Sequence, residues 1–442
     1  MKNRYTFYLS VLLMLVFQRY SFSAPLNGVS FDLEQPDGST VPVLVWGDEF
    51  YQHIESPDGF TLIRDKNGWI CYAKLSPDSS ELLPTDSIYT FSSGLKKSLQ
   101  DTPTNINREK HISIRKSERI KHHTKVRSFF NTTDNVAEET LQPSPAPAPD
   151  SNTVFPLAGV TPVIGKYLGL TILIDFSDKP ATMPVDSIKN FVNKQGYKSY
   201  NNNGSVRDYF YDVSGGKVDY QNIVVGYYRA KNPKTYYDNN TSTFALRAQE
   251  LIREALTWLK NSGFDFTQLS ADSRKQIYAV NVLYAGTPAM GWSKGLWPHQ
   301  GSISSFSASG MSITKYQMTN IGTSLDISTF CHENGHLLFR WPDLYDYGGE
   351  SNGVGGYCIM CNNSSKNPAR PCAYLRDLAG WDIVTDITDI VAGTIFKVIP
   401  NSNTSYMYRN KSNSNEMFYI EAAQRTGRNK TVPDSGFMIW HV

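Results

Sequence analysis

The feature that most constrains the fold of this 442-residue chain is the run 326–339, which carries two histidines and a glutamate among apolar side chains. His332 and His336 are four residues apart, so on an α-helix they lie on one face, one turn from each other. Asp326 stands where a helix N-cap is favoured, and Pro342 follows where a helix must stop. The segment therefore predicts a buried helix with two imidazoles on one side.

This spacing of His332, Glu333 and His336 is typical of a metal site. Both imidazoles can reach one ion, and Glu333, rotated by about 100° from His332, can touch a water on that ion without ligating it. Zinc lowers the pKa of such a water towards about 7, and the carboxylate can take its proton as the water attacks a carbonyl group. The alternative is that both histidines only pack on the helix. The apolar surroundings favour the active-site interpretation.

A catalytic zinc site needs a third protein ligand, since the fourth position is kept for water. Asp343 comes directly after the helix-ending Pro342 and is the best-placed oxygen if the chain reverses beneath the metal, with Asp346 in reserve. Three further carboxylates become candidates only if the third ligand comes from a separate helix, and none lies in a helical pattern: Glu350, Glu416 and Glu421.

The composition excludes several other classes of protein. Hydrophobic residues make up 40% of the chain and charged residues 19%, which rules out a disordered chain or a collagen-like fibre. The formal net charge of +2 argues against a dedicated nucleic-acid binder, which would carry a strongly basic face. No nucleic-acid partner is therefore expected.

Residues 1–23 have the pattern of a secretory signal peptide. Lys2 and Arg4 precede an apolar run, 8–17, and Ser21-Phe22-Ser23 offers small residues where a signal peptidase reads, so cleavage is expected after Ser23. The alternative is a membrane anchor, but about ten apolar residues are too short to span a bilayer. We therefore expect a secreted, extracellular protein with no transmembrane segment.

Two further parts precede the main domain. Residues 24–95 have the pattern of short strands separated by glycine-containing turns, which predicts a β-rich module. Residues 96–156 form a basic segment followed by a linker. Lys96 to Arg127 has ten Lys or Arg against three Asp or Glu, and is either a solvated surface or a segment that proteases can cut. The Pro/Ala-rich run 142–150 cannot build a core and separates the modules.

Residues 157–442 form the larger module. The nearly unbroken apolar run 167–176 is typical of a buried strand, and 276–284 is also strand-like. Residues 205–210 could begin a helix, and apolar residues at helical spacing over 246–259 predict a long one. Strands interleaved with helices indicate an α/β or α+β domain.

The segment Cys331-His-Glu-Asn-Gly-His-Leu-Leu-Phe-Arg-Trp-Pro-Asp-Leu-Tyr-Asp-Tyr347 resembles the active-site segment of the immune inhibitor A-like secreted metallopeptidases, a metzincin-related group. The resemblance covers most of residues 29–442, apart from the basic segment and the linker. The other matching stretches are Gln35–Gly38, Gly47–Phe50, Asp58–Gly59, Ser205–Phe210, Ser214–Asp219, Trp297–His299, Pro371–Trp381 and Gly436–His441.

The resemblance implies an α+β, zincin- or metzincin-like catalytic domain with a twisted mixed sheet and an active-site helix, preceded by a small β-rich propeptide. It makes His332, His336 and Asp343 the zinc ligands and Glu333 the general base, and it places Met360 in the methionine turn beneath the metal. The implied activity is that of a zinc endopeptidase made as a zymogen and acting on protein or peptide substrates. Calcium is implied as a stabilising ion, although no loop of the sequence proves a calcium site.

The sequence departs from the common metzincin spacing at two points. Phe339 stands where a glycine is usual, and Asp343 lies eleven residues after His332 instead of ten. The third ligand is therefore the assignment that the resemblance supports least. The apolar run that ends at Val442 also predicts a fragment of a longer protein, because the relatives continue beyond this point.

The five cysteines and one further histidine have other interpretations. His299 is expected to be structural, since no ligand spacing ties it to the metal helix. Cys71 could block zinc as a propeptide thiolate, but 69–73 has the pattern of a buried strand. In an oxidising compartment four cysteines could pair as two disulfides: Cys331, Cys358, Cys361 and Cys372. N-glycosylation acceptors that matter only in a glycosylating host are Asn131, Asn203, Asn240, Asn363 and Asn403.

Two other functions compete with the endopeptidase. A catalytically silent surface or adhesion protein could keep the fold, but intact His332, Glu333 and His336 count against it. A zinc hydrolase of small molecules is disfavoured by the module-plus-linker layout, because zymogens mostly restrain proteases. The sequence indicates no oligomeric state, substrate or activation site.

Overall fold

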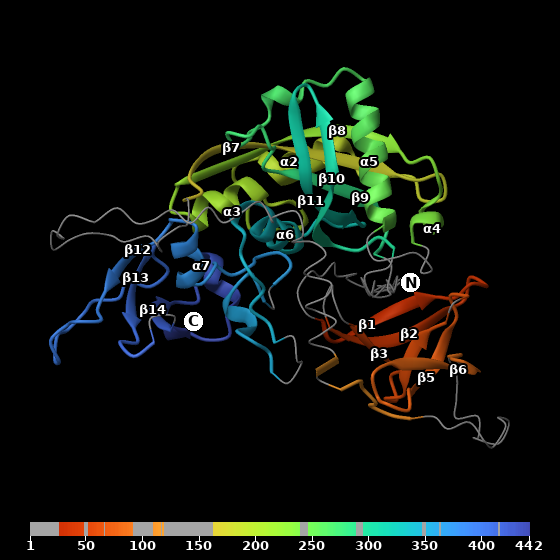
Figure 1. Ribbon diagram of the computed structural model, residues 1–442, viewed down its shortest axis with the longest axis horizontal. Coiled ribbons are helices and arrows are strands. Elements are labelled where there is room, and N and C mark those ends of the chain that lie inside the picture. Colours follow the sequence, from red (N-terminus) through yellow and green to blue (C-terminus); the bar gives the residue numbers. More distant parts are fainter. Residues whose placement is uncertain are drawn as a thin grey trace, which may run out of the picture.

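The computed structural model describes residues 26–47, 52–65, 67–91, 109–115, 117–118, 162–238, 246–288, 295–346, 351–361, 364–413 and 416–442. Three separate sheets combine with a few helices, so the α+β class is confirmed (Figure 1). The expected signal peptide and the Pro/Ala-rich linker lie outside the described residues. Within the described ranges, none of the helices is both long and apolar enough to cross a membrane.

The N-terminal module is an antiparallel sheet in which each strand pairs with the next one along the chain. Its turns contain Gly38, Gly59 and Gly68 with φ of 82°, 89° and 93°, a left-handed backbone that glycine adopts without a steric cost. The prediction of short strands separated by glycine turns is confirmed. The strands are β1 (Leu26–Glu34), β2 (Thr40–Gly47), β3 (Gln52–Glu55), β4 (Thr61–Arg64), β5 (Ile70–Leu75) and β6 (Leu82–Ile88).

Part of the basic segment packs against this module. Lys110 forms a β-bridge with Phe60, and the amide of Thr61 donates to the carbonyl of Glu109 at 3.2 Å. His111 and His53 both contact the carboxylate of Glu55, at 2.9 and 2.8 Å. Residues 109–115 therefore associate with the N-terminal sheet, which the composition alone did not indicate.

The central sheet has the order β10-β11-β9-β7-β8. Its neighbouring strands run parallel, except that the edge strand β10 runs antiparallel to β11. The last seven residues of β7 and all six of β9 are buried, as expected for strands covered on both faces. The strands are β7 (Gly165–Asp175), β8 (Val218–Arg229), β9 (Val280–Ala285), β10 (His299–Ala308) and β11 (Met311–Ile321).

Helices cover both faces of the central sheet (Figure 1). Helices α2 (Val185–Asn193), α3 (Val206–Val213) and α6 (Ile327–Phe339) pack on one face, and α5 (Leu246–Asn261) packs on the other. The helices expected at 205–210 and 246–259 are both present. A capping box between Ser205 and Asp208 begins α3.

A second, smaller sheet follows the central domain and was not expected as a separate element. Its order is β12-β13-β14-β15, and the short helix α7 (Ala373–Leu378) packs against it. A buried ion pair network joins Arg376 of α7 to Asp382 at 2.6 Å and to Glu421 at 2.9 Å. The strands are β12 (Ile383–Asp386), β13 (Thr404–Arg409), β14 (Met417–Ala423) and β15 (Gly436–His441).

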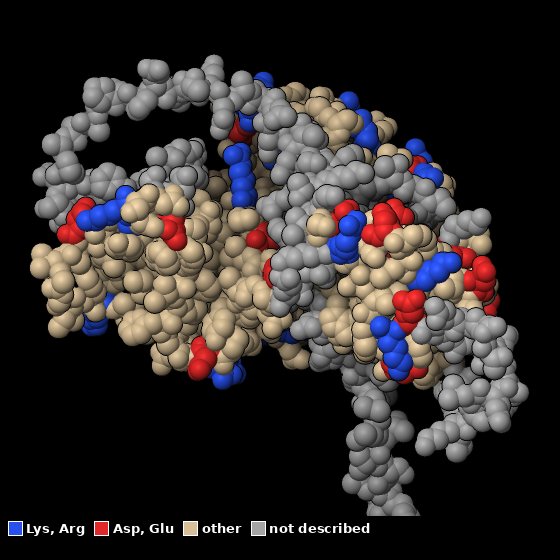
Figure 2. All heavy atoms as spheres, turned by 60° about the horizontal axis from the view of Figure 1, so that its bottom comes forward, with Lys and Arg blue, Asp and Glu red and all other residues tan. Residues whose placement is uncertain are grey.

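Charged side chains of both signs are scattered over the described residues of one face of the molecule (Figure 2). On the face in Figure 2, Lys and Arg are interspersed with Asp and Glu, and most of the described surface there belongs to other residues. This agrees with the formal net charge of +2.

Candidate metal centre

Helix α6 carries the two histidines and begins directly after Asp326, as predicted, but its capping contact differs from the prediction. Asp326 is at the N-cap position, but its side chain makes no capping bond and instead pairs with Lys366. The amide of Ile327 donates to Oδ1 of Asn202 at 3.2 Å, so an asparagine distant in the sequence caps the helix.

The end of α6 also differs from the prediction. The helix stops at Phe339 because Arg340 adopts a left-handed backbone with φ of 56°, two residues before Pro342. The amide of Arg340 still donates to the carbonyl of His336, at 3.2 Å. This turn reverses the chain and brings Asp343 back to the helix.

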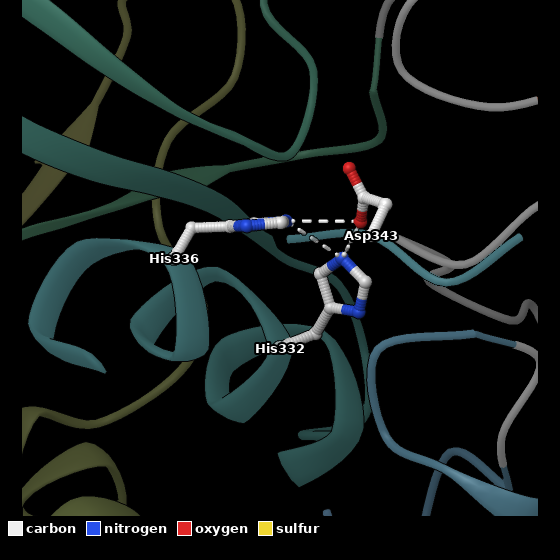
Figure 3. Close-up of side chains that lie close together, drawn as sticks. All are labelled: His332, His336 and Asp343. Carbon is white, nitrogen blue, oxygen red and sulfur yellow. Dashed lines mark hydrogen bonds and ion pairs between the residues drawn. The ribbon is translucent and has the colours of Figure 1, made fainter. Parts of the chain in front are cut away.

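The side chains of His332, His336 and Asp343 converge on one point (Figure 3). The two Nε2 atoms are 3.2 Å apart, and Oδ1 of Asp343 lies 3.1 Å from Nε2 of His332 and 3.0 Å from Nε2 of His336. The three donor atoms form a nearly equilateral triangle. His332 is 1% exposed and the side chain of His336 is 15% exposed, so the cluster is buried with its open side at His336.

Backbone carbonyls orient both imidazoles. Nδ1 of His332 faces the carbonyl of Ile359 at 2.9 Å, and Nδ1 of His336 faces that of Trp341 at 2.6 Å. Since a carbonyl can only accept, each Nδ1 carries a proton, which leaves Nε2 as the ring nitrogen that faces the cluster and can ligate a metal ion. Histidines that ligate metals are almost always held in this way.

The carboxyl group of Asp343 is held ionised. Its burial acts to raise the pKa of Asp343, but the imidazoles of His336 and His332 outweigh that effect, so this pKa lies well below its usual range. Two imidazole nitrogens and one ionised carboxylate oxygen are therefore gathered within the protein interior.

The donor set fits a zinc ion. Two ligands held at about 2.0–2.1 Å by a tetrahedral ion lie about 3.3 Å apart, and the observed separations are 3.0–3.2 Å. Calcium takes about six to eight oxygen ligands, which two imidazole nitrogens do not provide. We therefore take zinc as the ion for which these residues are suited, and no cluster of this kind suggests calcium in the described part of the chain.

The segment 358–361 forms a floor beneath α6. Met360 is fully buried, and its carbonyl accepts from the amide of Leu344 at 2.8 Å. A Cβ added at Gly335 would lie 2.7 Å from Sδ of Met360 and 2.9 Å from Trp341, so only glycine allows this close approach. The carbonyl of Ile359 holds the imidazole of His332, and the carbonyl of Met360 holds Leu344, the residue after Asp343. The floor therefore positions both His332 and the segment that carries Asp343.

The alternative third ligands lie elsewhere or are otherwise engaged. Oδ2 of Asp346 accepts from the amide of Ser351 at 2.9 Å. Glu421 binds Arg376 within the small sheet, and Glu416 pairs with His441 at 2.6 Å. Glu350 lies outside the described residues. Only Asp343 among the described candidates joins the two histidines.

Replacing Asp343 by Ala should weaken zinc binding by at least about 100-fold, because loss of a direct ligand should exceed the 10- to 100-fold typical for its supporting residues. The matched variant Asp346→Ala should change the affinity less than about threefold, since Asp346 accepts from Ser351 and is not part of the cluster. Competition with a chelator of known affinity measures both. A larger loss in Asp346→Ala would move the third ligand to that residue.

The two disulfides that the sequence left possible are not formed. All five cysteines are buried, and none of them is in a disulfide. Sγ of Cys358 accepts from the amide of Cys372 at 3.4 Å, and Cys361 donates to the carbonyl of Asn352 at 3.3 Å. Burial raises the pKa of Cys71 in β5 to about 11, which disfavours the thiolate that a zinc-blocking role requires.

His299 has a structural environment, as expected. It is 1% exposed and stacks on Trp297 with ring centroids 4.1 Å apart. Its Nδ1 contacts the carbonyl of Trp297 at 2.7 Å, and its Nε2 contacts the hydroxyl of Tyr316 at 2.8 Å. Burial lowers the pKa of His299 to about 4, so the folded protein keeps this imidazole neutral.

This neutral histidine predicts a loss of stability in acid. The unfolded chain takes up a proton below its ordinary pKa of 6.5, whereas the folded chain does so only near 4, so the free energy of unfolding falls as the pH drops between these values. The loss reaches up to about 3 kcal/mol. Urea unfolding of wild type and His299→Gln at pH 7 and pH 4.5 measures it. An equal fall in both proteins would contradict the prediction.

Several contacts at the site had no signal in the sequence. The backbone carbonyls of Ile359 and Trp341 orient the imidazoles. Every residue type has a backbone carbonyl, so the identity of these two residues does not reveal the contact. Asn202 caps α6 from a distance of 125 residues along the chain. Gly335 is the one hint, since a glycine inside a helix implies close packing.

A scan of the chain against protein-family models gave no match, and a search of curated proteins gave none either. The functional argument therefore depends on the residues and their geometry.

Proposed function

We propose that the chain is a secreted zinc endopeptidase that hydrolyses peptide bonds in protein or peptide substrates. The observation that carries this proposal is the triangle of donor atoms from His332, His336 and Asp343. Glu333 follows the first ligand directly in the sequence and is fully buried on the same helix. Two imidazoles, a carboxylate and an adjacent glutamate are what metal-assisted hydrolysis requires.

The fold supports a zincin- or metzincin-like catalytic domain. A mixed sheet and an active-site helix are both present, and that helix follows the strand next to the antiparallel edge strand β10. The longer spacing to the third ligand has a local reason. The left-handed residue is Arg340, one position after Phe339, where the common pattern has glycine, and Asp343 is correspondingly displaced by one. These features support the resemblance to the immune inhibitor A-like metallopeptidases.

The proposed chemistry divides between the ion and the protein. Bound zinc supplies a Lewis acid and lowers the pKa of water towards about 7. Glu333 accepts a proton from the attacking water and delivers it to the leaving amine nitrogen. His332 and His336 each donate their Nδ1 proton to a backbone carbonyl oxygen. Both Nε2 atoms are therefore left for the ion. Burial of the site excludes other water and strengthens these interactions.

We further propose that the protein is secreted as a zymogen. The signal-peptide pattern of residues 1–23 supports export, and the separate β-rich module supports a propeptide. Because residues 109–115 pack on that module, we place the activating cut after Arg115.

Chelation is the direct test of this function. The mature form should hydrolyse casein, should lose this activity with a chelator and should regain it when about one equivalent of zinc is added. The purified chain should contain about one zinc ion. Zinc-loaded protein that cleaves no unfolded substrate, even after proteolysis in the linker, would favour the silent surface protein instead.

A further inference from the structure

A network of buried polar side chains lies between the central sheet and α6, away from the metal ligands. It contains residues from three strands and one from the helix, each no more than 5% exposed. Its members are Tyr220 and Asn222 of β8, Asn281 of β9, Gln317 of β11 and Asn334 of α6. Buried polar groups of this kind are costly unless they are hydrogen-bonded, so their bonds define their positions closely.

The sheet side of the network holds the hydroxyl of Tyr220. Nδ2 of Asn281 donates to this hydroxyl at 2.9 Å and to Oδ1 of Asn222 at 2.8 Å. Asn281 is in turn held by Gln317, whose Nε2 donates to Oδ1 of Asn281 at 3.0 Å. A Cβ added at Gly169 of β7 would lie 2.9 Å from both the hydroxyl of Tyr220 and Asn222, so glycine makes room for this arrangement.

The link to the helix is a single bond. The hydroxyl of Tyr220 donates to Oδ1 of Asn334 at 3.0 Å. Asn222 is the other acceptor within reach, at 3.2 Å, but its Oδ1 already accepts from Asn281 and Thr171, which favours Asn334 for the single hydroxyl proton. Nδ2 of Asn334 donates to the carbonyl of Phe330 at 2.9 Å, which turns Oδ1 towards the sheet.

The position of Asn334 on α6 means that its bond to Tyr220 can determine the rotation of the helix about its axis. Asn334 is two residues from both His332 and His336, about 200° around the helix, so it points away from the metal cluster. The other α6 side chains in the same core include Phe330, Cys331 and Leu338, which are apolar and non-directional in their packing. One directional bond on such a face selects a single rotation of the helix, as a buried asparagine selects the register of a coiled coil.

We propose that Tyr220 is a positioning residue for the metal-binding helix, acting through Asn334 to fix the rotation that aims both imidazoles and Glu333. This inference rests on the proposed function for its effect on hydrolysis, but its effect on metal affinity does not require that function. Tyr220 touches neither metal nor substrate in this account.

The test compares two buried tyrosines of the same sheet. Tyr220→Phe removes the hydroxyl that reaches α6, while Tyr284→Phe removes a hydroxyl that bonds the carbonyl of Leu296 at 3.0 Å on the opposite face. Both rings are fully buried. We expect Tyr220→Phe to lower zinc affinity and kcat by about three- to tenfold with KM unchanged, the range one buried hydrogen bond supports. Tyr284→Phe should leave all three unchanged. Equal zinc affinity in the two variants overturns the inference.

A second variant tests the route through Asn334. Asn334→Leu should reproduce the loss of zinc affinity. The double variant with Tyr220→Phe should lose no more than the worse single variant, because the bond between Tyr220 and Asn334 is the one that both changes break. If the losses of zinc affinity in the two single variants added up in the double variant, the inference would be overturned. The absorption spectrum of the cobalt-substituted protein should shift in Tyr220→Phe and not in Tyr284→Phe, since it reports ligand geometry. A wild type that binds zinc but cleaves no peptide overturns only the proposed function.

Discussion

Replacing Glu333 by Gln is expected to lower kcat for peptide hydrolysis by about 10²- to 10⁴-fold while zinc stays bound. Glutamine keeps the size and one acceptor of glutamate but cannot take a proton, so the attacking water loses its base and the leaving amine its proton donor. The effect should fall on kcat more than on KM, because the proton is transferred only in the transition state. Steady-state kinetics on an unfolded protein substrate, with zinc content measured on the same sample, provides the check.

A matched carboxylate variant controls for this result. Glu416→Gln changes a carboxylate that pairs with His441 of β15 and is not part of the metal cluster, and it should keep the wild-type kcat. If Glu333→Gln kept wild-type turnover with zinc in place, Glu333 would not be the base and the proposed mechanism would be wrong.

Replacing His332 by Ala is expected to remove zinc from the purified protein and, with it, all measurable hydrolysis. The change deletes one of three donor atoms and leaves the carbonyl of Ile359 without the imidazole that it orients. His336→Ala should have the same effect. We expect affinity to fall by at least about 100-fold, for the reason given for Asp343. Metal analysis after dialysis measures the outcome.

The neighbouring Cys331→Ala is the control for this loss. Cys331 is as buried as His332 and lies on the same helix, but its side chain belongs to the apolar core on the sheet side. It should cost stability and keep about one zinc ion per chain. Full zinc occupancy in His332→Ala would end the metal-site interpretation altogether.

The local elements were predictable because their causes are local. An unbroken apolar run gives β7, apolar residues at helical spacing give α5, and glycines at turns separate the strands of the N-terminal sheet. The small C-terminal sheet was not predicted as a unit. The sheet is held by contacts such as that between Arg376 and Glu421, which are 45 residues apart in the chain. No local sequence pattern predicts a pair at this separation.

The helix boundaries show where local reasoning fails. Asp326 and Pro342 are the residues that propensity favours for a start and a stop, yet Asn202 caps the helix and Arg340 ends it. Tertiary contacts outweigh these preferences, because a cap or a turn residue contributes only about 1 kcal/mol and the surrounding core contributes much more.

What the sequence by itself determined is the local pattern on which the proposed chemistry depends. The spacing of His332, Glu333 and His336 requires only the 3.6-residue period of an α-helix, so the two proposed ligands and the proposed base fall on one helix by residue order. The choice of Asp343 over Asp346 was decided by the tertiary structure, since it depends on a left-handed turn at Arg340 and on a floor that includes Met360. The rotation of the helix was decided there too, by Tyr220. Helical periodicity places neighbours of one segment relative to each other, whereas the direction in which that segment faces depends on packing between segments far apart in the chain.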